Sequence, residues 1–160
     1  MNTQTLSTIL LFFICLCSKG QDIIEASFYN GTFEELKILA KKTQKPILLD
    51  FTATWCGPCR KMDEETYSDI EVATLIAKEY IAYKVDVDKI DNLELTLNNK
   101  ILNFPTVLFM DYNGKVSGRL IGFYLPEYFY KILEQNLFFK RKNLKNETEF
   151  TRMVDKIMKE

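Results

Sequence analysis

Apolar and polar positions along the first half of this chain predict a helix followed by a buried strand. The stretch Thr32-Phe33-Glu34-Glu35 forms a capping box, and the spacing of apolar residues after it predicts a helix to about residue 42. Pro46 ends that pattern. Residues 47–51 then form a nearly continuous apolar run, which is typical of a strand covered on both faces in an α/β sheet.

The middle of the chain continues the alternation of helix and strand. A helical pattern follows residue 59 and extends to about residue 65. Ser68-Asp69-Ile70-Glu71 fits a second capping box, which predicts another helix to about residue 79. Residues 80–86 alternate and are rich in β-forming side chains, so we expect a strand there, and residues 89–99 predict a short helix.

A hairpin and a helix complete the main pattern. Residues 106–112 and 115–121 favour strands, and Asn113-Gly114 between them fits a turn with positive φ. Pro126 opens a helix whose core face carries Phe129, Ile132, Leu133 and Leu137. Helices that alternate with strands favour parallel pairing, and the hairpin adds antiparallel strands. We therefore predict an α/β fold with a central mixed β-sheet flanked by helices.

Residues 144–160 predict an extra C-terminal helix. Asn146 to Glu149 can cap it, and apolar residues follow at helical spacing: Phe150, Met153, Val154, Ile157 and Met158. The simpler interpretation is a helix that covers its own domain, and the alternative is a helix that docks a partner.

Composition narrows the function. The chain has 160 residues, of which 47% are hydrophobic and 27% are charged, as expected of one globular domain with a real core. The formal net charge of −1 argues against nucleic-acid binding. The sequence has no histidine, which excludes a Cys-His or Ser-His catalytic pair.

The N-terminus predicts export. An apolar run of nine residues, Ile9 to Cys17, precedes small residues at Ser18 and Gly20, so residues 1–20 fit a cleaved signal peptide, although no Lys or Arg precedes the run. A membrane span needs about 20 apolar residues, so we expect no transmembrane segment in the mature chain. Lipidation at Cys17 is an alternative that bulky Leu16 disfavours. The expected location is the periplasm or the extracellular medium.

Cleavage after residue 20 would leave two cysteines, Cys56 and Cys59. One close pair cannot build a disulfide framework, so the pair is more easily explained by chemistry than by structure. A strand, a Cys-x-x-Cys and a helix in that order form a thioredoxin-like redox motif. The alternative, half of a zinc site, lacks a histidine or a second cysteine pair to complete four ligands. We therefore expect no metal and no cofactor beyond the Cys56–Cys59 disulfide.

The positions of these residues suggest their roles. Cys56 would lie at the N-terminal end of a helix, where free N–H groups favour a thiolate, and Cys59 would lie one turn further on. Pro58 suits a first helical turn. Asp50 interrupts a buried strand, and burying an unpaired carboxylate is costly. It is either a proton acceptor for Cys59 with a raised pKa, or a strand-end aspartate that faces solvent.

Trp55-Cys56-Gly57-Pro58-Cys59 matches the thioredoxin superfamily letter for letter, and the resemblance covers roughly residues 28–139. It implies a thioredoxin fold, with the thioredoxin-like domain at 21–143 and a helical extension at 144–160. The resemblance also implies that Asp50 accepts a proton and that Lys84 is its partner.

The same resemblance implies a client-binding region around the cysteines. By its position alone, Pro105 could be an ordinary strand-start proline with a trans peptide bond. The resemblance implies that it is cis and faces the pair, so that the backbone of Phe104 could bind an extended substrate segment as an added strand. Trp55 would supply an apolar platform beside Cys56, and the alternative is a tryptophan in the core. Gly122 matches the glycine that lets a partner approach closely.

Other stretches resemble the periplasmic thioredoxin-like domain of DsbD-type thiol:disulfide interchange proteins: residues 51–53, 65–69 and 104–109. Thr52 and Glu64 stand where cytosolic thioredoxins usually have Trp and Pro. Gly57-Pro58, in contrast, is the thioredoxin version of the motif.

Together these features predict an exported thiol:disulfide oxidoreductase that reduces protein disulfides through Cys56 and Cys59. Its partners would be disulfide-containing client proteins and an upstream electron donor such as a membrane thiol:disulfide carrier, with no nucleic acid, and we expect a monomer. One alternative is a disulfide oxidase or isomerase of the same fold. Another is a redox-silent protein-binding module.

Overall fold

The computed structural model describes residues 26–141 and 146–159, and the predicted signal peptide and Cys17 lie outside these ranges. Four strands form one sheet in the order β2-β1-β3-β4, with bounds β1 Ile47–Thr52, β2 Ile81–Asp86, β3 Thr106–Met110 and β4 Val116–Ile121. β1 is parallel to β2 and antiparallel to β3, and β3 is antiparallel to β4. The predicted mixed sheet is confirmed.

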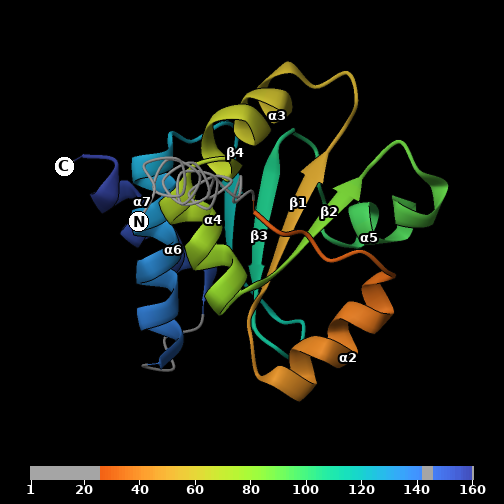
Figure 1. Ribbon diagram of the computed structural model, residues 1–160, viewed down its shortest axis with the longest axis horizontal. Coiled ribbons are helices and arrows are strands. Elements are labelled where there is room, and N and C mark those ends of the chain that lie inside the picture. The colour runs from red at the N-terminus through yellow and green to blue at the C-terminus, as the bar shows by residue number, and fades with distance from the viewer. Residues whose placement is uncertain (1–25, 142–145, 160) are drawn as a thin grey trace, which may run out of the picture.

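Helices cover both faces of the sheet (Figure 1). Their bounds are α2 Phe33–Thr43, α3 Gly57–Lys61, α4 Ile70–Glu79, α5 Leu93–Asn98, α6 Pro126–Arg141 and α7 Glu147–Ile157, with a π-helical segment at Met62–Tyr67 and a 3-10 turn at Ile90–Asn92. α2 and α5 lie against one face, and α4, α6 and α7 lie against the other. None of the helices in the described ranges is both long and apolar enough to span a bilayer.

Burial on both faces explains the apolar run of β1. Leu48 packs with α4 and α6 on one side, whereas Leu49 packs with α2 on the other. Because successive side chains of a strand point to opposite faces, both sets of positions in β1 must be apolar. Asp50 is the exception.

The capping box predicted at Ser68 is wrong. Asp69 is the N-cap of α4, and its carboxylate accepts the backbone N–H groups of Glu71 and Val72, each at 3.0 Å. The Ser68 hydroxyl instead donates to the Glu64 carbonyl at 2.5 Å. Ser68 still belongs to the end of the preceding helix, because the π-helical segment continues to Tyr67.

The turn predicted at Asn113-Gly114 is also different. Gly114 adopts a positive φ of 85°, but Asn113 does not. The Asp111 side chain closes the loop by accepting the N–H groups of Asn113 and Lys115, at 2.8 and 3.0 Å. An aspartate that bonds the backbone ahead of it favours a longer loop with one left-handed glycine over a two-residue turn.

The C-terminal helix forms as predicted. Asn146 caps α7 by accepting the N–H of Glu149 at 2.8 Å. Phe150, Met153, Val154 and Ile157 are buried against β4 and α6, while Met158 is largely exposed. α7 therefore covers its own domain.

Candidate active site

Cys56 and Cys59 form a disulfide at the start of α3, with their Cα atoms 5.3 Å apart. β1 ends at Thr52, and a short turn closed by a bond from the Cys56 N–H to the Ala53 carbonyl leads into the helix. Cys56 is the N-cap, and its Sγ accepts the backbone N–H of Cys59 at 3.2 Å. The pair lies where the sequence predicts it, at a helix N-terminus that stabilises negative charge on sulfur.

Both cysteines are nearly buried in this oxidised state. Cys56 is 4% exposed and Cys59 is 3% exposed, and they pack with Ala53 beside Val87 and Phe104. The two cysteines therefore do not differ in their exposure to solvent.

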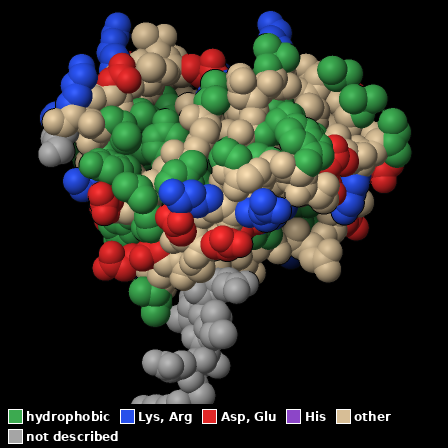
Figure 2. All heavy atoms as spheres, turned by 90° about the horizontal axis from the view of Figure 1, so that it is seen from above, with side chains coloured by type: hydrophobic (Ala, Val, Ile, Leu, Met, Phe, Trp, Pro, Cys, Tyr) green, Lys and Arg blue, Asp and Glu red, His purple; other side chains and the backbone are tan. Residues whose placement is uncertain are grey.

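Trp55 is an exposed platform at the active site, not a core residue. Its side chain is 66% exposed, and its ring meets that of Phe104 edge to face with centroids 5.7 Å apart. The indole N–H donates to Asp88 at 3.1 Å, which orients the ring. Figure 2 views the molecule from the end where α3 lies, and hydrophobic side chains gather there in patches bordered by charged ones.

The structure brings Phe104, Pro105 and Gly122 together. The Phe104–Pro105 peptide bond is cis, as the resemblance implies. The Pro105 carbonyl accepts the N–H of Gly122 at 2.8 Å. Gly122 has a φ of 93°, and a Cβ there would meet no atom within 4 Å, so this surface is open. Phe104 links this region to the cysteines by direct packing.

Asp50 lies inside the protein, so the interpretation as a solvent-facing aspartate is wrong. It is 2% exposed, and in the sheet it sits between Lys84 of β2 and Val107 of β3. Burial raises the pKa of Asp50 to about 7. The positive charge of Lys84 opposes this rise, the negative charge of Asp63 adds to it, and the Tyr67 hydroxyl opposes it.

Lys84 forms its ion pair with Asp63 of the π-helical segment. Its Nζ also lies over the rings of Phe28 and Tyr67, 4.8 and 5.6 Å from their centroids. The direct contact of Lys84 is therefore with Asp63, and Lys84 lowers the pKa of Asp50 through its charge.

Asp63 and Tyr67 are site residues that the sequence analysis did not identify. They lie one helical turn apart on the π-helical segment, and with Phe28 and Lys84 they line a pocket of about 440 Å³. The Tyr67 hydroxyl and Oδ1 of Asp50 are both buried, and the hydroxyl lies near enough to Asp50 to lower the pKa of its carboxyl. The sequence does contain one clue to these two residues. Asp63 and Tyr67 follow Cys59 at intervals of four, and residues four apart share a helix face.

The arrangement supports reversible dithiol–disulfide chemistry. Two sulfurs lie within bonding distance at a helix start, and a buried carboxyl that titrates near neutrality lies in the strand leading to them. In residues 26–141 and 146–159, no three or more Cys, Asp or Glu side chains gather as metal ligands.

A family model described as a thioredoxin-like domain matches residues 33–137. The chain is 38% identical over 96 residues to the thiol:disulfide interchange protein DsbD of Campylobacter jejuni, an alignment that covers 59% of this chain and 17% of that protein. It is 38% identical over 73 residues to Thioredoxin-1 of Drosophila melanogaster, covering 46% and 64%. The chain spans less than a fifth of the length of its DsbD relatives.

Solved structures confirm the thioredoxin fold. A thioredoxin from Thermus thermophilus superposes with a TM-score of 0.63 at 24% identity, covering 69% of this chain and 88% of that one. The reduced C-terminal domain of Neisseria meningitidis DsbD superposes with a TM-score of 0.55 at 26% identity, covering 64% and 91%.

Proposed function

The chain belongs to the thioredoxin-like family, and on that premise we propose that it is an exported thiol:disulfide oxidoreductase that reduces disulfides in client proteins. The observation that carries the proposal is the Cys56–Cys59 disulfide at the start of α3, with buried Asp50 in the strand before it.

In the first step, the reduced protein attacks the client through Cys56. The Cys56 thiolate forms a bond to one client sulfur, the client disulfide breaks, and the second client sulfur leaves and takes up a proton. The helix start supports this role, since the N–H of Cys59 points at Cys56 Sγ and favours negative charge there.

In the second step, Cys59 resolves the mixed disulfide. Asp50 accepts the thiol proton of Cys59, and a pKa of about 7 keeps part of this carboxyl ionised near neutral pH. The Cys59 thiolate attacks Cys56 Sγ, the Cys56–client bond breaks, and the client sulfur leaves as a thiolate and takes up a proton. Two electrons have then passed to the client, and the pair returns to the disulfide form. An upstream dithiol, such as a membrane thiol:disulfide carrier, would reduce it again.

Client binding would use the surface around Trp55, Phe104, Pro105 and Gly122. An extended client segment would bond to the backbone of Phe104 as an added strand, and Trp55 would give it an apolar contact. The open space over Gly122 lets a second backbone approach.

The N-terminal apolar run supports export, to the periplasm or the extracellular medium. We expect the mature protein to be monomeric, to act on disulfide-containing clients and to bind no nucleic acid.

Trapping tests the mechanism directly. Cys59→Ser leaves Cys56 able to attack but removes the resolving thiol, so we expect covalent adducts between Cys56 and disulfide-containing proteins that a reducing agent releases. Cys56→Ser with Cys59→Ser is the control and should form none. If folded Cys59→Ser protein, checked by circular dichroism, forms no adduct with any disulfide protein, the two-thiol mechanism is wrong.

The direction of electron flow follows from the reduction potential, measured against glutathione. A value near that of thioredoxin, about −270 mV, supports a reductase, whereas a value near about −120 mV supports the oxidase alternative. Partner binding that the double cysteine variant leaves unchanged, with no reduction of insulin by the parent, would support the redox-silent binding module.

A further inference from the structure

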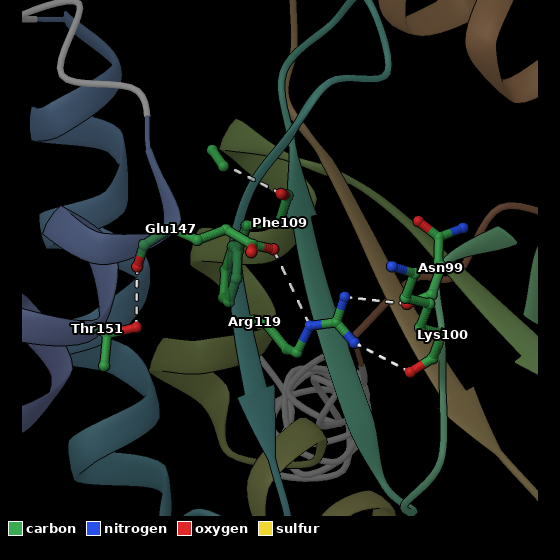
Figure 3. A network of polar contacts seen from close by, with 7 residues as sticks. Asn99, Lys100, Phe109, Arg119, Glu147 and Thr151 are labelled. Carbon is green, nitrogen blue, oxygen red and sulfur yellow. Dashed lines mark hydrogen bonds and ion pairs between the residues drawn. The ribbon is translucent and has the colours of Figure 1, made fainter.

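Arg119 of β4 connects three parts of the fold through one side chain (Figure 3). Its Nη2 donates to the Asn99 carbonyl at 2.9 Å, and its Nη1 donates to the Lys100 carbonyl at 3.4 Å. Its Nε lies 4.0 Å from the Glu147 carboxylate of α7. A guanidinium can make such contacts simultaneously because it presents several N–H donors in a fixed plane.

The two carbonyls belong to the motif that ends α5. The N–H of Lys100 donates to the Leu97 carbonyl at 3.0 Å, and the N–H of Ile101 donates to the Thr96 carbonyl at 3.1 Å. This is a Schellman motif, which needs a left-handed residue and usually has glycine there. Lys100 adopts it with a φ of 53°, a conformation that is unfavourable for a residue with a side chain. Arg119 stabilises this left-handed conformation of Lys100, because it donates to the carbonyl before Lys100 and to the carbonyl of Lys100 itself.

The end of α5 sets the direction of the segment that leads to the active site. After Lys100, Ile101 is anchored in the core, and Leu102 is 84% exposed. Phe104 then meets Trp55 and the cysteines. Phe104 is only four residues after Lys100. A change in the backbone conformation of Lys100 would therefore displace Phe104 and the Phe104–Pro105 peptide bond.

The other end of the network lies on the C-terminal helix. β4 is one of the two edge strands of the sheet, and Glu147 is the first residue of α7. A Cβ on Gly118 would lie 2.3 Å from the Phe150 ring, so the glycine lets α7 pack directly on β4. Arg119 follows Gly118 and points to the opposite face. Because β4 lies at an edge of the sheet, the guanidinium can bond to the end of α5 on that face and still lie 4.0 Å from Glu147 of α7.

We propose that Arg119 is a positioning residue for client binding, which holds residues 99–105 in the conformation that presents Phe104 and Pro105. This inference rests on the proposed function where it concerns clients. The hydrogen bonds to the Asn99 and Lys100 carbonyls contribute most to holding this segment, because the contact with Glu147 is long and Glu147 is exposed. Glu147→Gln should therefore change little.

Kinetics provide the first test. Arg119→Gln should raise KM for a disulfide-bonded protein such as insulin by about tenfold, the equivalent of one charge-assisted hydrogen bond, with kcat within about twofold. The rate with a small aromatic disulfide, which needs no binding groove, should stay within about twofold. Arg119→Lys should give an intermediate KM. Arg152→Gln removes the same charge from an exposed position on α7 and is the matched control. An unchanged KM for insulin, or an equal loss with both substrates, overturns the proposal.

Hydrogen exchange tests whether Arg119 holds residues 99–105, and it requires no activity assay. In Arg119→Gln, the amides of Lys100 and Ile101 should exchange about tenfold faster than in the parent, while those of β1 should not change. Exchange at wild-type rates would show that Arg119 does not hold this segment. If the parent protein reduces no disulfide, the proposed function fails, and hydrogen exchange alone decides whether Arg119 holds the segment.

Discussion

Replacing Asp50 with Asn should make the stability of the protein much less dependent on pH. Asp50 is buried at the centre of the sheet, and burial raises its pKa from the ordinary value of 3.8 to about 7. Well below pH 3.8 the carboxyl is protonated in both the folded and the unfolded protein, so its titration does not affect stability. As the pH rises towards 7, the unfolded chain releases the proton first, and the folded state becomes progressively less stable relative to it.

The size of the effect follows from the two pKa values. A rise of the pKa from 3.8 to about 7 corresponds to about 4 kcal/mol, at about 1.4 kcal/mol for each pKa unit. This cost is small at pH 3.5, grows through pH 4–7 and is nearly complete at pH 8. Asn has nearly the same shape and cannot ionise. Asp50→Asn should therefore match the parent at the lowest pH and exceed its free energy of unfolding by up to about 4 kcal/mol at pH 8.

Urea denaturation of the oxidised proteins, followed by far-UV circular dichroism between pH 3.5 and 8, measures this difference. Asp91→Asn, at an exposed position of the 3-10 turn, is the control and should follow the parent at every pH. Parallel curves for Asp50→Asn and the parent across this range would show that burial does not raise the pKa of this carboxyl.

Three further predictions test other parts of the structure. Lys84→Gln removes the positive charge that lowers the pKa of Asp50, so a carboxyl titration followed by NMR should give a higher pKa, and an unchanged value would contradict the electrostatic role of Lys84. Gly122→Ala should lower the free energy of unfolding by about 1 to 3 kcal/mol because φ is 93°. Gly57→Ala, equally open but without a positive φ, should change it by less than about 0.5 kcal/mol, and equal effects would rule out backbone strain as the cause. Phe150→Ala should cost about 3 to 5 kcal/mol in urea denaturation if α7 is part of the core, and a loss below about 1 kcal/mol would show that it is not.

Most of the helices and strands could be predicted because their signals are local. The apolar run at 47–51, the cap at Asn146 and the helical spacing after it each depend on residues within one or two turns of one another. The place of the cysteines was predictable for the same reason, since a strand, a short turn and a helix must follow in that order. The errors at Ser68 and at Asn113 were also local. In each case a neighbouring aspartate, Asp69 or Asp111, bonded the backbone in place of the expected residue.

The electrostatics of the site depend on contacts that no local pattern contains. The sequence left two environments open for Asp50, and only the packing of helices on the sheet buried it. Lys84 meets Asp63 across 21 positions of the chain, and Arg119 meets Asn99 across 20. Such contacts form only when β2, β4 and the helices are packed together. Periodicity thus determined which segments are helices, which are strands and where the sulfurs lie. The charge state of the carboxyl and the support of the cis-proline segment were decided by tertiary structure, because desolvation and side-chain pairing depend on residues far apart in sequence.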